Sequence, residues 1–201
     1  HNGGAISGEN AVITATRNVQ LQGGSIAANN ARVTAGNKMG LASGSIVADT
    51  IALTATSGAI AETNGYVVNA GTLNVAAGQG ISLSSEANKL KNVVIDNAGD
   101  SVAIVSGNDE NVDLNVSTAQ GKTVNGSISV TNVAAGSSLN KIEVDKALQA
   151  SGNITLVNNE SDINVNANSI VSAANITLQA NCNAINFNGG SVNATATKSN
   201  L

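Results

Sequence analysis

The 201-residue chain contains no proline and only one cysteine and one histidine. Each proline would remove one backbone N–H donor, so its absence suits a structure in which almost every N–H donates to a neighbouring strand. The single cysteine, Cys182, excludes an internal disulfide framework, and without a base beside it we expect a packed thiol rather than a nucleophile. The single histidine, His1, is typical of a cloning remnant or a cleavage product. Catalysis by Ser/His/Asp or Cys/His sets and the usual zinc sites are therefore not expected.

Aromatic and charged residues are also scarce. Tyr66 and Phe187 are the only aromatic residues, although 42% of the chain is apolar, which predicts a narrow core of Ile, Val, Leu and Ala. The net charge of −4 and the apolar fraction argue against disorder. The 9 basic residues are scattered, so no nucleic-acid partner is expected. No apolar run reaches the length of about 18 residues that a membrane-spanning helix needs, and no pattern calls for a cofactor.

The chain repeats itself with a step of about twenty residues. A glycine and two aliphatic residues recur together in three successive units. Units of this length that contain strands and no helix cannot bury an apolar face alone, so they must stack as a solenoid. The recurring positions are Gly4, Gly24 and Gly44, then Ile6, Ile26 and Ile46, and then Ile13, Val33 and Leu53.

Within each repeat, apolar and polar residues alternate as in a β-strand with one buried face. We therefore predict an all-β fold, a right-handed parallel β-helix (β-solenoid) with about 20–22 residues per coil. Roughly nine to ten coils, about 4.8 Å apart, would form a rod about 45 Å long. The residues expected inside are Ile6, Ala11, Ile13, Ala15, Val19 and Leu21 in the first coil, Ala31, Val33 and Ala35 in the second, and Ile51, Leu53 and Ala55 in the third.

The whole chain, residues 1–201, is predicted to be a single β-helix segment. Regular coils are expected over 1–85 and again over 127–201. Over 86–126 the step breaks down, which predicts coils of irregular length. One or two acidic loops between Asp96 and Asp113 should protrude there and carry any binding specificity. These loops lack the oxygen-ligand spacing of a known calcium loop.

Outward-facing threonines form the sharpest periodic polar feature of the sequence. Thr14, Thr34 and Thr54 are expected to stack as a ladder, with Thr16 and Thr56 beside them. Flat Thr-x-Thr arrays on β-solenoids occur in ice-binding proteins, so an ice-binding module is one alternative function. The pattern ends after three coils, and outward threonine is favoured on strands in any case.

Four carboxylates define a second alternative, a carbohydrate-active enzyme. Glu143 and Asp145 would share one strand face, and Glu160 and Asp162 repeat that spacing about one coil later. Converging in a groove, they would supply a general acid/base pair or a Ca²⁺ site. If they instead point separately into water, they are a solvated strand face, which is the interpretation that we favour.

Several phrases, GSIVADTIALTATSGAI, GTLNVAAGQGISLSS and GNITL, resemble the repeats of filamentous-haemagglutinin-type exoproteins, which are bacterial adhesins exported by two-partner secretion. The resemblance is close from Gly3 to about Ser84 and looser from Gly126 to Ala196. The family's secretion domain with its Asn-Pro motif has no counterpart here. The resemblance implies a long extracellular β-helical shaft that displays binding regions and has neither catalysis nor a cofactor.

The leading functional hypothesis is therefore the structural, adhesive shaft of a secreted or cell-surface bacterial adhesin rather than an enzyme. Its expected partners are host-cell, other-cell or matrix surfaces, contacted through loops, with no insertion into membranes. The opening residues lack the features of a signal peptide, which favours a piece of a longer exported chain. No cap covers the first coil, so homotypic end-to-end stacking into filaments is a variant of the same hypothesis.

Overall fold

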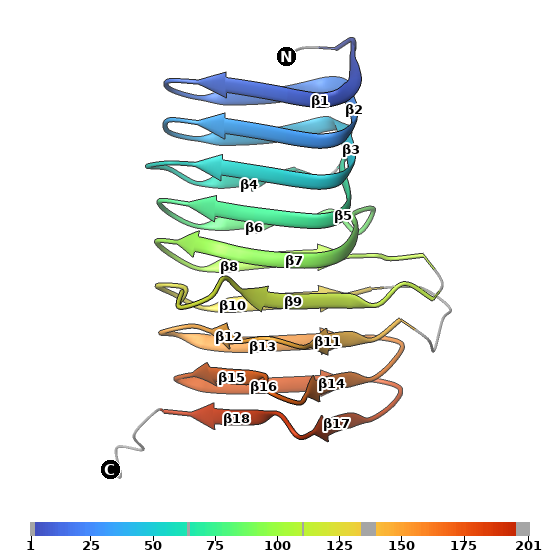
Figure 1. Ribbon diagram of the computed structural model, residues 1–201, viewed down its shortest axis with the longest axis vertical. Coiled ribbons are helices and arrows are strands. Elements are labelled where there is room, and N and C mark those ends of the chain that lie inside the picture. Colours follow the sequence, from blue (N-terminus) through green and yellow to red (C-terminus); the bar gives the residue numbers. More distant parts are fainter. Residues whose placement is uncertain (1–2, 64, 110, 134–139, 196–201) are drawn as a thin grey trace.

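A computed structural model describes residues 3–63, 65–109, 111–133 and 140–195. Over these residues the protein is all-β and has no helix, and its parallel strands stack as a right-handed solenoid of about 9 turns (Figure 1). The predicted fold class is confirmed. Because the described residues form no helix, none of them could cross a membrane in helical form. The described strands are β1 (Ala5–Ala15), β2 (Val19–Ala35), β3 (Met39–Ala55), β4 (Ile60–Glu62), β5 (Tyr66–Ala77), β6 (Ile81–Leu83), β7 (Lys89–Ala98), β8 (Val102–Ser106), β9 (Leu114–Thr118), β10 (Ile128–Asn132), β11 (Ile142–Val144), β12 (Leu148–Gln149), β13 (Asn153–Asn158), β14 (Ile163–Asn166), β15 (Ile170–Ala173), β16 (Asn175–Ala180), β17 (Ile185–Asn188) and β18 (Ser191–Ala194).

One 15-stranded sheet wraps around most of the solenoid. Its strands follow the order β16-β13-β10-β8-β6-β4-β3-β5-β7-β9-β11-β14-β17, and β1 and β2 stack on β3. The long strand β3 belongs to two faces, because Met39–Leu41 pairs with β4 whereas Gly44–Ala55 pairs with β5. A separate sheet, β12-β15-β18, forms a third face in the C-terminal coils.

The structure confirms the predicted alternation of buried and exposed side chains along the strands. Ile51, Leu53 and Ala55 are all 0% exposed, and the residues between them are partly exposed. Val33, Leu53 and Val75 lie side by side in successive coils, so each inward side chain packs on its counterparts above and below. Each such residue buries most of its apolar surface, which stabilises the fold by roughly 1.5–3 kcal/mol per side chain.

Coil length varies along the axis. The step is 20 residues between β1 and β2 and 22 between β3 and β5. It rises to 26 residues from β8 through β10 to β13 and returns to 22 between β14 and β17. The described residues between β8 and β9 extend from one side of the rod (Figure 1).

Asp96 lies within β7 rather than in a loop. The pairing of β5 with β7 shifts register at this point, because Val75 pairs with Ile95 and Ala76 with Asn97. Asp96 is thus the extra residue of a β-bulge, a feature that bends and twists a strand locally.

The first and last coils cover their inward side chains on one side only. Ile6, Ile13 and Ala15 are partly buried and pack against the core, as predicted. At the other end, Ile185 and Phe187 remain 38% and 56% exposed although their counterparts one coil earlier are fully buried.

Candidate functional site

A ladder of buried asparagine and serine side chains runs along one corner of the solenoid interior. Its members are buried inside the coil, although asparagine and serine are mostly exposed in folded proteins. Because a buried amide without partners costs roughly 1–3 kcal/mol, each member must be hydrogen-bonded. The ladder, in chain order, consists of Ser85, Asn88, Ser106, Asn108, Asn132, Asn140, Asn158 and Ser161, all at most 5% exposed.

These side chains add hydrogen bonds to the strand pairing at the corner. The amide of Asn158 donates to the carbonyls of Asn140 and Asp162, at 2.9 and 2.8 Å. The amide of Asn132 also donates to the Asn140 carbonyl, at 3.1 Å. The side chains of the paired strands β10 and β13 are therefore also joined to the segment that leads into β11.

Among the residues that the structure describes, Glu62 is the one charged residue whose side chain is buried, at 5% exposure. Its Oε2 accepts hydrogen bonds from the backbone N–H of Ser85 at 2.8 Å and from the amide of Asn88 at 2.9 Å. Its Oε1 is buried without a partner. Burial raises the pKa of Glu62 above its ordinary 4.5, and the hydrogen bonds only partly oppose this shift. Burial, together with the charge of Glu62, also raises the pKa of the Tyr66 phenol.

On the outside of the same sheet, a column of polar residues runs through the whole described length. Asn30 donates to Asn10 at 3.2 Å, and Asn186 donates to Asn164 at 2.9 Å. Such amide-to-amide bonds between coils tie neighbouring turns together. The column consists of Asn10, Asn30, Thr50, Thr72, Asn92, Asn115, Glu143, Asn164 and Asn186.

Glu143 and Asp145 form a carboxylate pair where this column meets the long coils. Asn166 donates to both carboxylates, at 2.5 Å to Glu143 and at 2.6 Å to Asp145. Asn164 donates to the other oxygen of Glu143 at 2.6 Å, and Asn115 donates to the other oxygen of Asp145. The two side chains are therefore held in fixed orientations by amides from the coils on either side.

The four carboxylates of the enzyme hypothesis do not gather. The coil step here is 21 residues, so Asn164, rather than Glu160 or Asp162, lies beside Glu143. Asp162 instead accepts from the backbone N–H of Ala184 at 2.9 Å and from the amide of Asn186 at 3.3 Å. No three His, Cys, Asp or Glu residues of the described chain are placed to hold a metal ion. The four residues therefore do not converge in the way that an acid/base or Ca²⁺ site would require.

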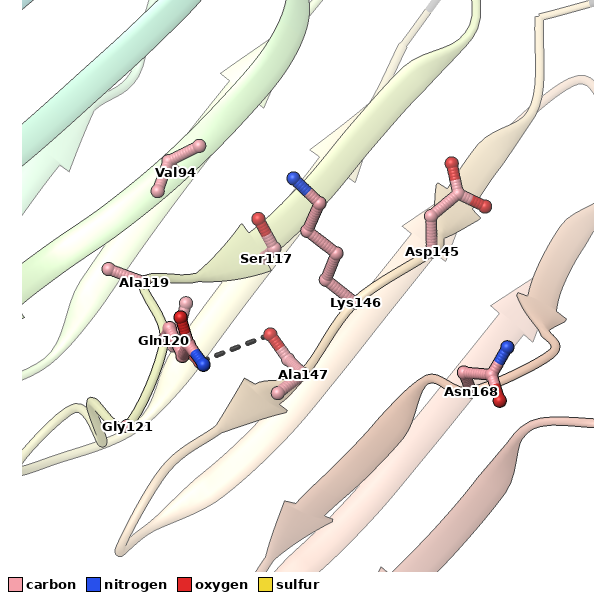
Figure 2. Close-up of a pocket in the computed structure, with 10 residues that line it drawn as sticks. Val94, Ser117, Ala119, Gln120, Gly121, Asp145, Lys146, Ala147 and Asn168 are labelled. Carbon is pink, nitrogen blue, oxygen red and sulfur yellow. Dashed lines mark hydrogen bonds between the residues drawn. The ribbon is translucent and has the colours of Figure 1, made fainter.

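Two adjoining hollows, with volumes of about 600 and 560 Å³, lie against the carboxylate pair and share Asp145. We call them together the side groove. Figure 2 shows the first hollow, with Lys146 extending over it toward Ser117 and with Val94 on the opposite strand. The polar residues along the first hollow include Ser117, Gln120, Asp145, Lys146 and Asn168, and those along the second include Lys91, Asn92, Asp113, Asn115, Glu143 and Asn166.

The threonine ladder forms as predicted over three coils. Thr14, Thr34 and Thr54 occupy the same position in successive coils, and Ala76 follows them. The hydroxyl oxygen of Thr34 is buried and has no hydrogen-bond partner. A hollow of about 200 Å³ borders Thr54, so the surface is not flat beyond the ladder.

The acidic segment between β8 and β9 is tied to the rod. Lys89 forms an ion pair with Asp109 at 2.8 Å and also donates to the Gly107 carbonyl. Asp113 accepts the backbone N–H of Lys141 at 2.8 Å. Of the other residues singled out in the sequence, His1 and Glu110 lie outside the described residues.

The cysteine is not packed. Cys182 lies in the turn between β16 and β17 and is exposed. The expectation of a packed thiol is wrong.

Comparisons of the chain with protein-family models, with curated proteins and with solved structures found no match. The class of protein is therefore defined by the fold alone, as a parallel β-solenoid.

Proposed function

We propose that this chain is part of the rigid shaft of a secreted or cell-surface bacterial adhesin. The observation that carries the proposal is the sheet that continues from β1 to β16 and β17. A shaft must keep two ends apart under load, and here the described coils are joined to their neighbours by parallel strand pairing and by inward aliphatic stacks. From Asn88 to Asn158, buried amides add to these links. The likeness of its repeats to those of filamentous-haemagglutinin-type adhesins supports extracellular display.

Adhesive contacts would be made from the side of the rod. The described residues between β8 and β9 project there, and segments that leave a solenoid are where binding commonly resides. The Lys89–Asp109 ion pair limits the motion of the first segment relative to the coils. In this proposal, host-cell, other-cell or matrix surfaces are the partners, and no cofactor or catalytic step is involved.

Stacking of separate copies into filaments is a further form of the proposal. Ile185, Phe187 and Val192 occupy inward positions and are 38%, 56% and 38% exposed. An additional coil, from the continuation of the same chain or from a second copy, would bury them as the earlier coils bury Val165 and Val171. Stacking of this kind would extend the same sheet along the axis.

Two measurements test the proposal. Cryo-electron microscopy of the purified chain at several concentrations should show straight rods, and rods much longer than about 45 Å would establish end-to-end stacking. Antibodies raised against the chain should label intact, unpermeabilised cells of the source bacterium, and external protease should remove the label. Label that appears only after permeabilisation would overturn the surface role. If intact cells are labelled but the purified chain forms only short rods, filament formation is rejected and the proposal of an adhesin shaft stands.

A further inference from the structure

We propose that the side groove binds a neutral, hydroxyl-rich glycan chain across the coils. This inference names the ligand class of the proposed adhesive role and rests on that role. It comes from the hydrogen-bonding capacity of the carboxylate pair, from the charge of the groove and from the apolar surface beside it.

The carboxylate pair offers acceptors that the protein does not use. Each oxygen of Glu143 and Asp145 accepts one amide hydrogen bond from Asn115, Asn164 or Asn166. A carboxylate oxygen accepts two hydrogen bonds, so each of the four retains one acceptor position. Both amide hydrogens of Asn166 are already committed to the pair. The ligand must therefore bring its own donors, and neighbouring sugar hydroxyls are donors at suitable spacing.

Charge narrows the ligand class further. In the part of the chain that the structure describes, neither Glu143 nor Asp145 has a cationic partner within 4.0 Å. A sulfated or uronic-acid chain would place its own anions against this pair, at a cost that the exposed Lys91 and Lys146 at the edges only partly offset. Neutral sugars avoid this repulsion, and the two ammonium groups can donate to their ring and hydroxyl oxygens.

The groove also has an apolar side. Val94, Ala119 and Ala147 line the first hollow and Val112 lines the second. Sugar rings present C–H groups on their faces and hydroxyls at their edges, so they suit a groove that combines aliphatic side chains with acceptors. A peptide suits it less, because the strands beneath are already paired on both sides and leave no free edge for strand addition.

The groove is preorganised, which lowers the cost of binding. The amides of the neighbouring coils hold the two carboxylates, and Asn111 and Asn168 border the hollows in left-handed conformations, with φ of 64° and 67°. Asparagine adopts left-handed backbone conformations more readily than most residues, so these two turns form with little conformational strain. Without aromatic rings for stacking, we expect a single-site Kd of about 1 mM, which display of many copies on one surface would strengthen.

Saturation-transfer NMR and a glycan array, both with the full 201-residue chain, test the inference. The probes are neutral oligosaccharides of glucose, galactose, mannose and N-acetylhexosamines, with heparin-type sulfated oligosaccharides as the anionic comparison. We expect binding of at least one neutral series. Asp145→Asn should weaken it at least ten-fold, and Lys146→Gln, which changes an exposed side chain, should weaken it several-fold. Asp49→Asn, at an exposed carboxylate on β3 away from the groove, should leave it within two-fold.

Circular dichroism and thermal melts establish whether each variant is folded. If Asp145→Asn does not fold, Lys146→Gln still tests the groove. The inference is overturned if no neutral glycan binds, if sulfated chains bind better, if peptides alone bind, or if folded groove variants bind like the parent. None of these results bears on cell-surface labelling, which tests the shaft itself. Conversely, glycan binding by a chain that is not displayed on cells would reject the adhesin role and leave the groove's chemistry intact.

Discussion

The side-chain amide of Asn88 donates to Oε2 of the buried Glu62 at 2.9 Å, and its carbonyl oxygen accepts the backbone N–H of Val68 at 2.8 Å. One asparagine therefore links a buried carboxylate to the strand of a neighbouring coil. The other carboxylate oxygen, Oε1, has no partner. This position combines a tight structural contact with a charge that is costly to bury.

Replacing Glu62 by Gln should flatten the pH dependence of stability. The pKa of Glu62 is raised in the folded state, so the native chain binds its proton more tightly than the unfolded chain. Its contribution to the free energy of unfolding is then greatest below pH 4.5 and declines as the pH rises through the folded pKa. Relative to the parent, the melting temperature of Glu62→Gln should rise as the pH increases above 4.5 and should level off above the folded pKa. Parallel melting curves for the two proteins at every pH would contradict this account, and Glu86→Gln, at an exposed carboxylate, serves as the control.

Removing the side chain of Asn158 should strongly destabilise the solenoid. Asn158→Ala leaves the buried carbonyl of Asn140 short of one donor and removes the bond to Asp162. Losing these bonds and leaving a cavity should lower the free energy of unfolding by about 2–4 kcal/mol. Urea denaturation measures this loss. Asn175→Ala, which removes an exposed amide bond to Asn153, should cost no more than about 0.5 kcal/mol. Equal losses in the two variants would show that the buried ladder has no special role.

Replacing Thr34 by Val should stabilise the fold, in contrast to the loss expected for Asn158→Ala. The hydroxyl of Thr34 is buried without a partner, so it incurs a desolvation cost that a methyl group of similar size avoids. We expect Thr34→Val to raise the free energy of unfolding by up to about 1 kcal/mol. Thr14→Val, at the exposed end of the same column, is the matched substitution and should change stability little. A clear loss of stability in Thr34→Val would mean that its hydroxyl is satisfied in solution.

The core of the fold was predictable because its signal is both periodic and local. Leu53 alternates with its neighbours and recurs as Val33 one step earlier, so its burial follows from two independent patterns. Asn158 carries no such signal. Asparagine is frequent at exposed turns, and only the packing of three separate segments shows that this one is inside.

The carboxylate pair shows a different limit of sequence interpretation. The spacing between Glu143 and Glu160 was read as about one coil, whereas the true step brings Asn164 beside Glu143. The step from β11 to β14 is 21 residues, as the predicted coil length requires, so the 17 residues from Glu143 to Glu160 are too few for one coil. On the other side, Asn115 lies 28 residues before Glu143, and local alternation carries no information about so long a step. The side groove, which depends on this register, could not have been located from the sequence.

Gly99→Ala should be among the most disruptive single-methyl changes in the chain. Gly99 lies at a corner where coils approach closely, and a Cβ there would be 2.0 Å from the carbonyl oxygen of Gly78. Its backbone N–H also donates to the Ala77 carbonyl at 3.1 Å, so moving the corner away would break the ladder. We expect a loss of about 2–3 kcal/mol in urea denaturation.

Gly8→Ala provides the comparison, because the nearest atom to its added Cβ is 4.0 Å away. Alanine there should be neutral or slightly stabilising, since it restricts the unfolded chain without straining the folded one. If Gly99→Ala were tolerated equally well, the coils at this corner would have to separate and re-pair at little cost. Such compliance would be incompatible with a rigid shaft, so this pair of variants tests the mechanical basis of the proposed function as well as the packing.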